Sequence, residues 1–214
     1  MLISSTADLG GDKLADCFEM DEENNPALGY RGIRISLEKD EMFRTQLRAI
    51  LRASVYGNVS IMFPMITSLE EVKAAKVQLE RAKKELSANK TAYNKDIEVG
   101  VMIETPAAVM ISGELAREVD FFSIGTNDLL QFTLGMDRTN AKIDSYYNPH
   151  HPALLKMIRI ITNNGHLEEK RISICGDLAA DLSLTEYFLQ IGIDELSVAP
   201  GQVLGLRKKI REIQ

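Results

Sequence analysis

Two short apolar segments, each followed closely by an acidic residue and the start of a helix, place the strongest constraint on the fold. Residues 99–103 and 121–124 are too short for typical helices and have the composition of buried strands. The segment between them, with a helix expected over 106–117, has the length of a crossover between parallel strands. If the two strands are neighbours, Glu104 and Asp128 emerge side by side at their C-terminal ends.

Two carboxylates in this arrangement would repel each other unless a cation lies between them. Mg²⁺ binds one or two protein carboxylates and leaves its other positions to water and substrate oxygens. The sequence therefore predicts a Mg²⁺ site formed by Glu104 and Asp128. An alternative stays open at this point, in which Glu104 caps a neighbouring helix and Asp128 is an N-cap.

The rest of the chain alternates between strand and helix signals. Further strands are expected over residues 1–6, 59–65, 171–174 and 193–198, and further helices over 37–54, 68–87, 152–163 and 203–213. Ser-x-x-Glu capping boxes at 68–71 and 183–186 are expected to open two helices. About six strand-then-helix units without a linker predict one α/β domain over residues 1–214, with a parallel sheet under helices.

The residues that could take part in catalysis or binding follow strands, which is where α/β barrels place their sites. Doubly wound sheets also bind ligands there, but the glycine-rich dinucleotide and nucleotide-phosphate motifs are absent from the sequence. The glycine pair Gly10-Gly11 is compatible with a phosphate-facing turn or with a plain turn. These observations favour an α/β barrel, and the doubly wound sheet stays open at this point.

Composition excludes several classes of function. The net charge of −6 and a pI near 5.2 argue against a nucleic-acid-binding surface. No apolar run has the length of a membrane span, and no signal-peptide pattern opens the chain. Cys17 and Cys175 are far apart and lack metal-site spacing, which favours a reduced, cytoplasmic compartment.

Cations, an amide and a thiol are expected at the same edge of the sheet as the two acids. Arg31 and Arg138 can pair with carboxylate or phosphate groups, and Asn127 offers an amide. Together with a metal and the thiol of Cys175, they suit a small phosphorylated carboxylic acid as ligand. A buried, inert thiol is the ordinary reading of Cys175 when it is considered alone.

Five motifs together carry a resemblance to a known family. The segments are NPALGYRGIR, IMFPMI, VGVMIETPAA, DFFSIGTNDLLQFTLGMDR and CGDLAAD. They resemble the phosphoenolpyruvate (PEP)-binding barrel of Enzyme I of the bacterial sugar phosphotransferase system, and the resemblance covers the whole chain. It implies a (β/α)8 fold of the TIM-barrel type, present here as about six βα units with the first two missing.

The resemblance also implies roles for individual residues. Glu104 and Asp128 would hold the Mg²⁺ that PEP also ligates, and Asn127 and Arg138 would contact the phosphate or carboxylate of PEP. A metal and arginines supply the charge neutralisation on which phosphoryl transfer depends.

Two residues are implied to be catalytic. Arg31 would stabilise the phosphoryl group in flight, and Cys175 would protonate the methylene carbon of enolpyruvate. The phosphoryl group would then pass to a histidine of the enzyme and on to the histidine-containing phosphocarrier protein for sugar uptake, with pyruvate as the product. Enzyme I is a cytoplasmic homodimer through this domain, and the same is expected here.

The sequence departs from the family pattern at its N-terminal end. Ser5 stands where the family has a phosphate-binding arginine, and neither the first two βα units nor the histidine-bearing part is present. Each lost charge-assisted contact removes about 1.5–3 kcal/mol, so weak PEP binding is expected of this chain alone. Two exposed sheet edges would favour dimerisation or aggregation.

Three alternative functions stay open. The chain resembles, less closely, the barrels of pyruvate phosphate dikinase and PEP synthase, of which it would then be a fragment. A Mg²⁺-dependent aldolase or lyase could use the same acids to stabilise pyruvate enolate. A non-catalytic remnant that binds or dimerises is the alternative that is not an enzyme, and Ser5 favours it for the isolated chain.

Overall fold

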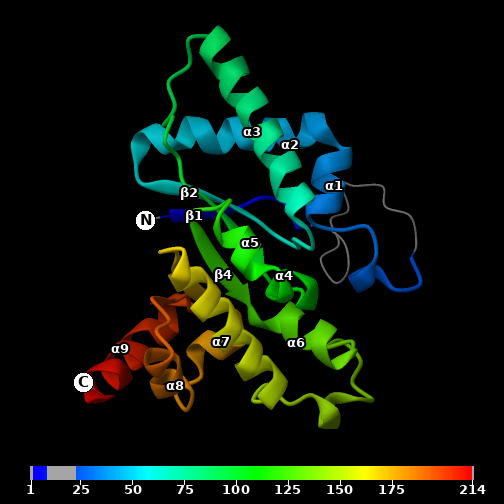
Figure 1. Ribbon diagram of the computed structural model, residues 1–214, viewed down its shortest axis with the longest axis vertical. Coiled ribbons are helices and arrows are strands. Elements are labelled where there is room, and N and C mark those ends of the chain that lie inside the picture. The colour runs from blue at the N-terminus through cyan, green and yellow to red at the C-terminus, as the bar shows by residue number, and fades with distance from the viewer. Residues whose placement is uncertain (1, 9–22, 214) are drawn as a thin grey trace. The chain divides into compact units, whose positions relative to one another are not determined.

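The computed structural model describes residues 2–8 and 23–213, which form two compact units. Met1–Val101 make the first unit and Met102–Gln214 the second. The glycine pair Gly10-Gly11 and the thiol of Cys17 lie outside the described residues. Each unit is therefore described by itself, and strand β3 (Val99–Ile103) has residues in both. Figure 1 labels helices and strands of the two units.

The first unit has parallel strands in sequence order. Strands β1 (Leu2–Ser5) and β2 (Val59–Phe63) pair with each other, and β2 pairs with the start of β3. Every residue of β2 is buried, as expected for an apolar strand covered on both faces. Its helices are α1 (Ile33–Glu38), α2 (Asp40–Ala53) and α3 (Leu69–Ala88), with 3-10 turns η1 (Pro26–Leu28) and η2 (Ser54–Tyr56).

The structure corrects the single helix that was expected over 37–54. The chain instead forms α1 and α2, which Lys39 separates with a non-helical backbone at φ −92° and ψ 61°. The apolar spacing that predicted a helix is correct for α2, whose buried residues are Phe43, Leu47, Ile50 and Leu51. The break was not visible because Lys39 is an ordinary helix former.

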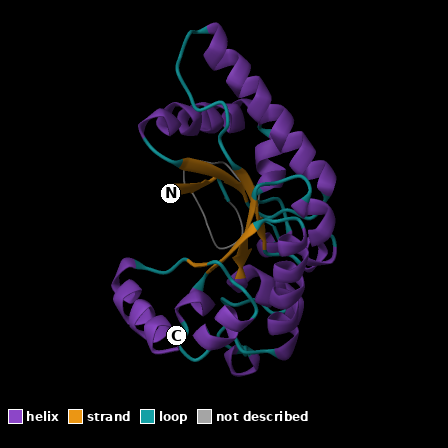
Figure 2. Ribbon diagram, turned by 60° about the vertical axis from the view of Figure 1, so that its left-hand side comes forward, coloured by secondary structure: helices purple, strands orange, loops and turns teal. Residues whose placement is uncertain are grey.

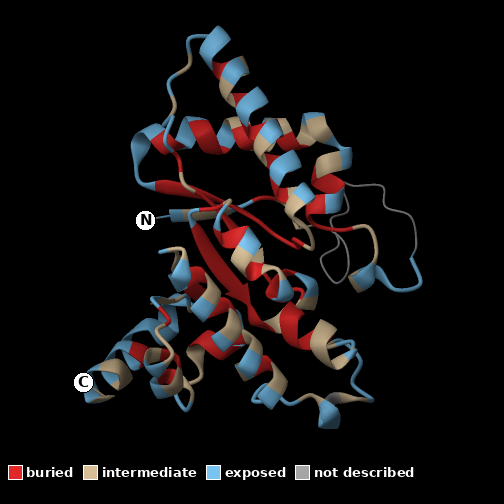
Figure 3. Ribbon diagram, in the orientation of Figure 1, coloured by how far each residue is buried: buried red, intermediate tan, exposed pale blue. Residues whose placement is uncertain are grey.

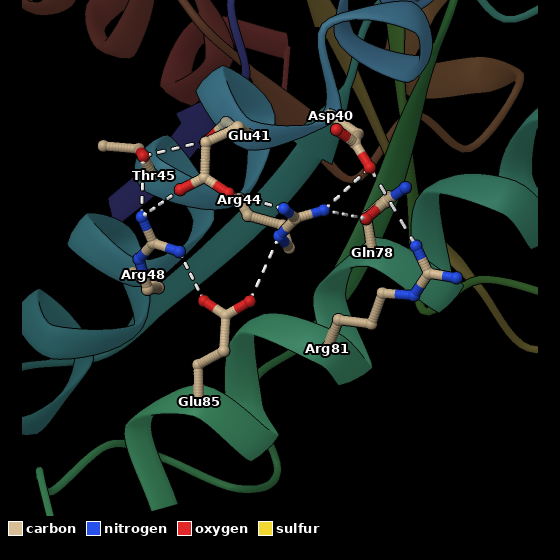
Figure 4. A network of polar contacts seen from close by, with 8 residues as sticks. All are labelled: Asp40, Glu41, Arg44, Thr45, Arg48, Gln78, Arg81 and Glu85. Carbon is tan, nitrogen blue, oxygen red and sulfur yellow. Dashed lines mark hydrogen bonds and ion pairs between the residues drawn. The ribbon is translucent and has the colours of Figure 1, made fainter. Parts of the chain in front are cut away.

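Ion pairs join α2 to α3 on the exposed side (Figure 4). Arg44 binds Asp40 at 2.8 Å and Glu85 at 3.1 Å, while Arg48 binds Glu41 at 3.1 Å and also Glu85. The hydrogen bond from Arg44 holds the pKa of the Asp40 carboxyl below its usual value, and Arg48 does the same for the pKa of Glu41. Exposed pairs of this kind add little to stability, so the charged face is mainly a solvated surface.

One of the two predicted capping boxes is confirmed. The Ser68 hydroxyl accepts a hydrogen bond from the Glu71 N–H at 3.2 Å, and the Glu71 carboxylate accepts one from the Ser68 N–H at 2.9 Å. The second box is wrong, because α8 (Thr185–Gln190) begins after Leu184 without a side-chain cap. The Ser183 hydroxyl instead donates to Asp181 at 2.6 Å.

The second unit is built on parallel strands β4 (Phe121–Gly125), β5 (Arg171–Cys175) and β6 (Glu195–Leu196). Strand β4 is buried throughout (Figure 3), and the last residues of β4 and β5 are register partners. Its helices are α4 (Pro106–Met110), α5 (Ser112–Ala116), α6 (Thr126–Leu134), α7 (Pro152–Leu167), α8 and α9 (Val203–Ile213). The 3-10 turns are η3 (Asp144–Tyr146), η4 (Asp177–Ala180) and η5 (Pro200–Gln202).

Two expected elements of this unit differ in the structure. The helix expected over 106–117 is two short helices, because Ile111 leaves the helical backbone at φ −105° and ψ 18°. The strand expected over 193–198 is reduced to Glu195–Leu196, which pairs with β5 only at Ser173 and Ile174. The alternation of strands and helices remains (Figure 2), and it confirms the α/β class. In the part of the chain that is described, no helix combines the length and apolarity needed to cross a membrane.

Helix α7 packs closely on β4 and β5 at Gly165. A Cβ atom added there would lie 2.3 Å from Ile172 Cδ1 and 3.3 Å from a ring carbon of Phe122. The neighbouring Asn164 donates to the Ser112 hydroxyl at 2.8 Å, which ties α7 to α5. This glycine therefore sets how near the helix approaches the strands.

We expect Gly165→Ala to destabilise the chain by about 1–3 kcal/mol, because the added methyl overpacks the contact with Ile172. Ile172→Val removes the clashing Cδ1 atom and costs about 0.5–1.5 kcal/mol by itself. The double variant should be less destabilised than the sum of the two single changes. Urea unfolding measures all three, and a simple sum would contradict the packing described here.

Candidate functional site

Glu104 directly follows β3 and is buried, with 2% of its surface exposed. The next residue, Thr105, caps α4, since its hydroxyl accepts a hydrogen bond from the Ala108 N–H at 3.1 Å. Pro106 then takes the first helical position, as expected from its fixed φ. The cap of α4 is therefore supplied by Thr105 and not by Glu104.

Asp128 lies in the first turn of α6, the helix that follows β4, and is 5% exposed. The N-cap position of this helix belongs to Gly125, so the alternative of Asp128 as an N-cap is wrong. A guanidinium nitrogen of Arg138 lies 3.4 Å from Asp128 Oδ2. This contact ties the start of α6 to the segment that follows the helix.

Gly125 brings the two acidic positions to one edge of the second unit. A Cβ atom added to Gly125 would lie 2.7 Å from Glu104 Oε2 and 2.8 Å from Glu104 Cβ. The Glu104 side chain therefore lies directly against the end of β4, three residues before Asp128. The end of β4 and the residue after β3 are therefore in close contact, and a side chain at residue 125 would clash with Glu104.

Asn127 and Asp177 form a reciprocal pair across the ends of β4 and β5. The Asn127 amide donates to Asp177 Oδ2 at 3.1 Å, and the Asp177 backbone N–H donates to Asn127 Oδ1 at 3.1 Å. The Thr126 hydroxyl also donates to the Cys175 carbonyl at 2.9 Å. These three bonds hold together the two segments that carry the predicted amide and thiol.

The thiol of Cys175 is half-buried at the end of β5. The Ser123 hydroxyl, on β4, donates to Cys175 Sγ at 3.3 Å, and the thiol donates to the Ile124 carbonyl at 3.4 Å. A hydroxyl donor on the sulfur stabilises a thiolate, and a partly exposed sulfur can be reached by a ligand. This environment differs from that of an inert core thiol.

Arg138 lies beyond the C-terminus of α6. This helix ends at Gly135 in the left-handed conformation, with φ 61°. The backbone N–H of Arg138 then donates to the side chain of Gln131 at 3.0 Å, which brings the guanidinium back toward Asp128. The structure thus brings Arg138 together with the predicted acid, as the sequence analysis expected.

The sequence analysis assigned no role to Tyr147, which the structure places among the charges of the site. Burial raises the pKa of its phenol, Arg138 lowers it, and Asp177 and Asp128 raise it further. These three influences show that the half-buried ring lies within electrostatic reach of all three side chains. Its position depends on the chain path from 139 to 149, for which the sequence carries no periodic signal.

Arg31 belongs to the first unit and is 1% exposed. Its guanidinium binds Asp8 through two contacts, Nη2 to Oδ2 at 2.9 Å and Nε to Oδ1 at 3.4 Å. It precedes Gly32, which opens α1 with φ 58°. The predicted role of Arg31 in phosphoryl transfer stays a prediction. Ser5, at the end of β1, donates to the neighbouring Thr6 carbonyl at 3.1 Å.

The donor set of the second unit fits Mg²⁺ better than a metal that needs several protein ligands. Within residues 2–8 and 23–213, no group of three or more His, Cys, Asp or Glu side chains is arranged to hold a metal ion. Mg²⁺ needs only one or two carboxylates. Glu104 and Asp128 offer two carboxylates near the end of β4, which meets that requirement.

The adjacent histidines of the loop have other partners. His151 caps α7 by accepting a hydrogen bond from the Ala153 N–H at 3.2 Å, and His150 contacts the Asp181 carboxylate. Both interactions join the start of α7 to its surroundings.

Comparison with known proteins gives matches in both sequence and fold. A phosphoenolpyruvate-protein phosphotransferase from Priestia megaterium is 44% identical over 212 residues, which is 99% of this chain and 37% of that relative. A citrate lyase from Burkholderia xenovorans LB400 aligns with a TM-score of 0.57 at 20% identity, covering 78% of this chain and 53% of that one. Pyruvate kinase from Pyrobaculum aerophilum aligns with a TM-score of 0.58 at 16% identity, covering 81% of this chain and 40% of that one.

The fold and the polar groups at its strand ends define an α/β domain of the TIM-barrel type, which confirms the expected fold class. Over residues 1–214 the sequence matches the family described as PEP-utilising enzyme, PEP-binding domain. The chain belongs to this family. It spans 37% of the length of the curated relatives that it matches.

We expect Gly125→Ala to displace the Glu104 side chain, because the new methyl would overlap its carboxylate. The variant should lose at least tenfold in Mg²⁺ affinity, equivalent to about 1.4 kcal/mol. Gly113→Ala in α5 is a matched control, since its Cβ would meet nothing within 4 Å and should stabilise the helix by about 0.5–1 kcal/mol. Calorimetric titration with MgCl₂ measures the affinities, and equal values for both variants would contradict the close approach at Gly125.

Proposed function

We propose that this chain is the PEP-binding catalytic part of a phosphoenolpyruvate-protein phosphotransferase of the Enzyme I type. The longer protein would transfer the phosphoryl group of PEP to one of its own histidines and on to a histidine-containing phosphocarrier protein in sugar uptake. Membership of the PEP-binding family and the 44% identity to a named phosphotransferase support the proposal. The same identity favours it over a dikinase or a PEP synthase.

The observation that carries the proposal is the close approach of the buried Glu104 to Gly125, three residues before the buried Asp128. Mg²⁺ needs only one or two protein carboxylates, and these two would hold it. When bound, the metal would neutralise charge on the phosphate and enolate oxygens of the ligand. The low exposure of both acids keeps water away from that position and strengthens their electrostatic effect.

Asn127 and Arg138 would orient PEP at this edge. The Arg138 guanidinium can bind phosphate or carboxylate through two parallel N–H donors, and Asn127 offers a further amide donor. Arg138 already lies 3.4 Å from Asp128, so its position is fixed before a ligand arrives. Arg31 of the first unit would stabilise the phosphoryl group during transfer, and its bidentate bond to Asp8 supports a fixed orientation.

Cys175 would complete the reaction as the general acid. Loss of the phosphoryl group leaves the enolate of pyruvate. The S–H bond breaks, its proton forms a C–H bond at the methylene carbon, and the enolate oxygen becomes the carbonyl of pyruvate. The sulfur is left as a thiolate, which the Ser123 hydroxyl stabilises through its hydrogen bond at 3.3 Å. A thiol with a pKa near 8.5 can donate a proton at neutral pH.

The wider assembly follows from the same proposal. The phosphocarrier would be bound by parts of the longer protein, residues 1–214 would act as one domain, and two copies would pair through it in the cytoplasm. A strand edge at β1, where Leu2 is 63% exposed, is available for such pairing.

We expect Glu104→Gln to remove Mg²⁺-dependent binding of PEP. The neutral amide keeps the shape of the side chain but lacks the charge that attracts the cation. Calorimetric titration with PEP in saturating MgCl₂ should give heat with the original chain and none with the variant. Glu114→Gln is the control, because it removes one negative charge from an exposed position on α5. Equal heats from Glu104→Gln and the original chain would exclude the proposed metal ligand.

Cys175→Ala should abolish exchange of the pyruvate methyl protons with solvent deuterium while Mg²⁺ still binds. This exchange is the reverse of the proposed protonation, and it needs only pyruvate, Mg²⁺ and the thiolate. Proton NMR in D₂O follows loss of the methyl signal, and Cys17→Ala is the matched control. Unchanged exchange in Cys175→Ala would assign the proton transfer to another group.

A further inference from the structure

We propose that Asp177 is a positioning residue that orients the amide of Asn127 toward the ligand and holds the exits of β4 and β5 together. This inference rests on the proposed function, because it concerns the same site. The sequence motif around Cys175 contains Asp177, but the proposed reaction gives this acid no part. A negative charge beside an anion-binding site weakens anion binding by repulsion, so the presence of Asp177 there calls for a structural explanation.

The two hydrogen bonds between Asn127 and Asp177 allow one orientation of the amide. The carbonyl oxygen accepts from the Asp177 N–H, and the nitrogen donates to the Asp177 carboxylate, both at 3.1 Å. Rotating the amide by 180° would place its oxygen against the carboxylate and its N–H₂ group against the backbone N–H. Both contacts would then be repulsive, so Asp177 fixes where the nitrogen of Asn127 lies.

The amide of Asn127 retains a donor for a ligand. Its nitrogen carries two hydrogens, and the Asp177 carboxylate accepts one of them. Among the residues that the structure describes, no second acceptor bonds this nitrogen, and Asn127 is half-buried rather than enclosed. The fixed amide therefore presents an N–H group that can bind an oxygen of an anionic ligand.

The surrounding backbone leaves little room for a looser arrangement. Gly176 has φ 89°, and a Cβ atom there would lie 2.6 Å from the Thr126 hydroxyl and 2.8 Å from Asn127 Oδ1. The Thr126 hydroxyl donates to the Cys175 carbonyl at 2.9 Å. Residues 125–127 and 175–177 thus contact each other along their length. A substitution at Asp177 should therefore alter the position and accessibility of the Cys175 thiol.

The test compares Asp177→Ala, which removes the side-chain acceptor, with Asp177→Asn, which removes the charge but keeps an acceptor. We expect Asp177→Ala to weaken PEP affinity in saturating MgCl₂ about tenfold, the effect of losing a charge-assisted hydrogen bond. Asp177→Asn should recover most of that affinity. Glu114→Ala, which removes an exposed charge on α5, should leave the affinity unchanged.

If Asp177 acts only through its charge, the PEP affinity of the variants should change in the opposite direction. Removing a negative charge near an anion site would then strengthen PEP binding equally in Asp177→Ala and Asp177→Asn. That result would overturn the inference.

A second measurement requires no substrate and separates this inference from the proposed function. The rate of alkylation of Cys175 by iodoacetamide, read by mass spectrometry of its peptide, should rise several-fold in Asp177→Ala and stay near the original value in Asp177→Asn. Both variants lose the same charge, so a difference between them reports on position. The peptide containing Cys17 serves as the internal reference.

The two measurements fail in different ways. If the original chain does not bind PEP at all, the proposed function fails, and the alkylation rates still decide the role of Asp177. If PEP binds and neither measurement distinguishes Asp177→Ala from the original chain, the inference alone fails. Should Asp177→Ala not fold, Asn127→Asp replaces it, because two facing carboxylates also break the pair, and Asn127→Asp/Asp177→Asn should restore the slow alkylation.

Discussion

The close contact between the end of β4 and the residue after β3 is the constraint on which the site of the second unit depends. Parallel strands end at the same edge of a sheet, so polar side chains that follow them lie near one another whatever path the loops take. Here the convergence is tightened by Gly125, whose missing side chain leaves the space that the Glu104 carboxylate borders. The same register places the end of β5 beside β4 and brings Cys175 to that edge.

Local signals in the sequence predicted the elements that depend on local physics. The apolar runs gave β2 to β5, and the reciprocal box at Ser68 and Glu71 predicted the start of α3. The box at 183–186 failed because the Asp181 carboxylate binds the Ser183 hydroxyl, a competition that the Ser-x-x-Glu pattern does not reveal. The breaks at Lys39 and Ile111 depend on how each short helix packs, so spacing alone could not show them.

The residues of the site also fall into two groups: those that local sequence signals predict, and those whose positions depend on contacts between loops. Glu104, Asn127, Asp128 and Cys175 could be predicted as candidates because each lies at or just after the C-terminal end of a strand. Arg138 was expected through its motif, and the structure adds the contact with Asp128. Asp177 and Tyr147 acquire their positions from contacts with other loops, as in the Asn127–Asp177 pair, which spans 50 residues of sequence. No periodicity or spacing carries that information.

The charges of the second unit also bear on the order of binding. Glu104, Asp128 and Asp177 contribute three carboxylates to this edge, and Arg138 is already engaged by Asp128. An anionic ligand would meet net repulsion here before a divalent cation is bound, whereas the cation would meet attraction. In the proposed enzyme, cation binding should therefore raise the affinity for the anion, and by linkage the anion should raise the affinity for the cation by the same factor. The Asn127 amide that Asp177 holds in place gives the anion a hydrogen-bond donor without adding charge to this edge.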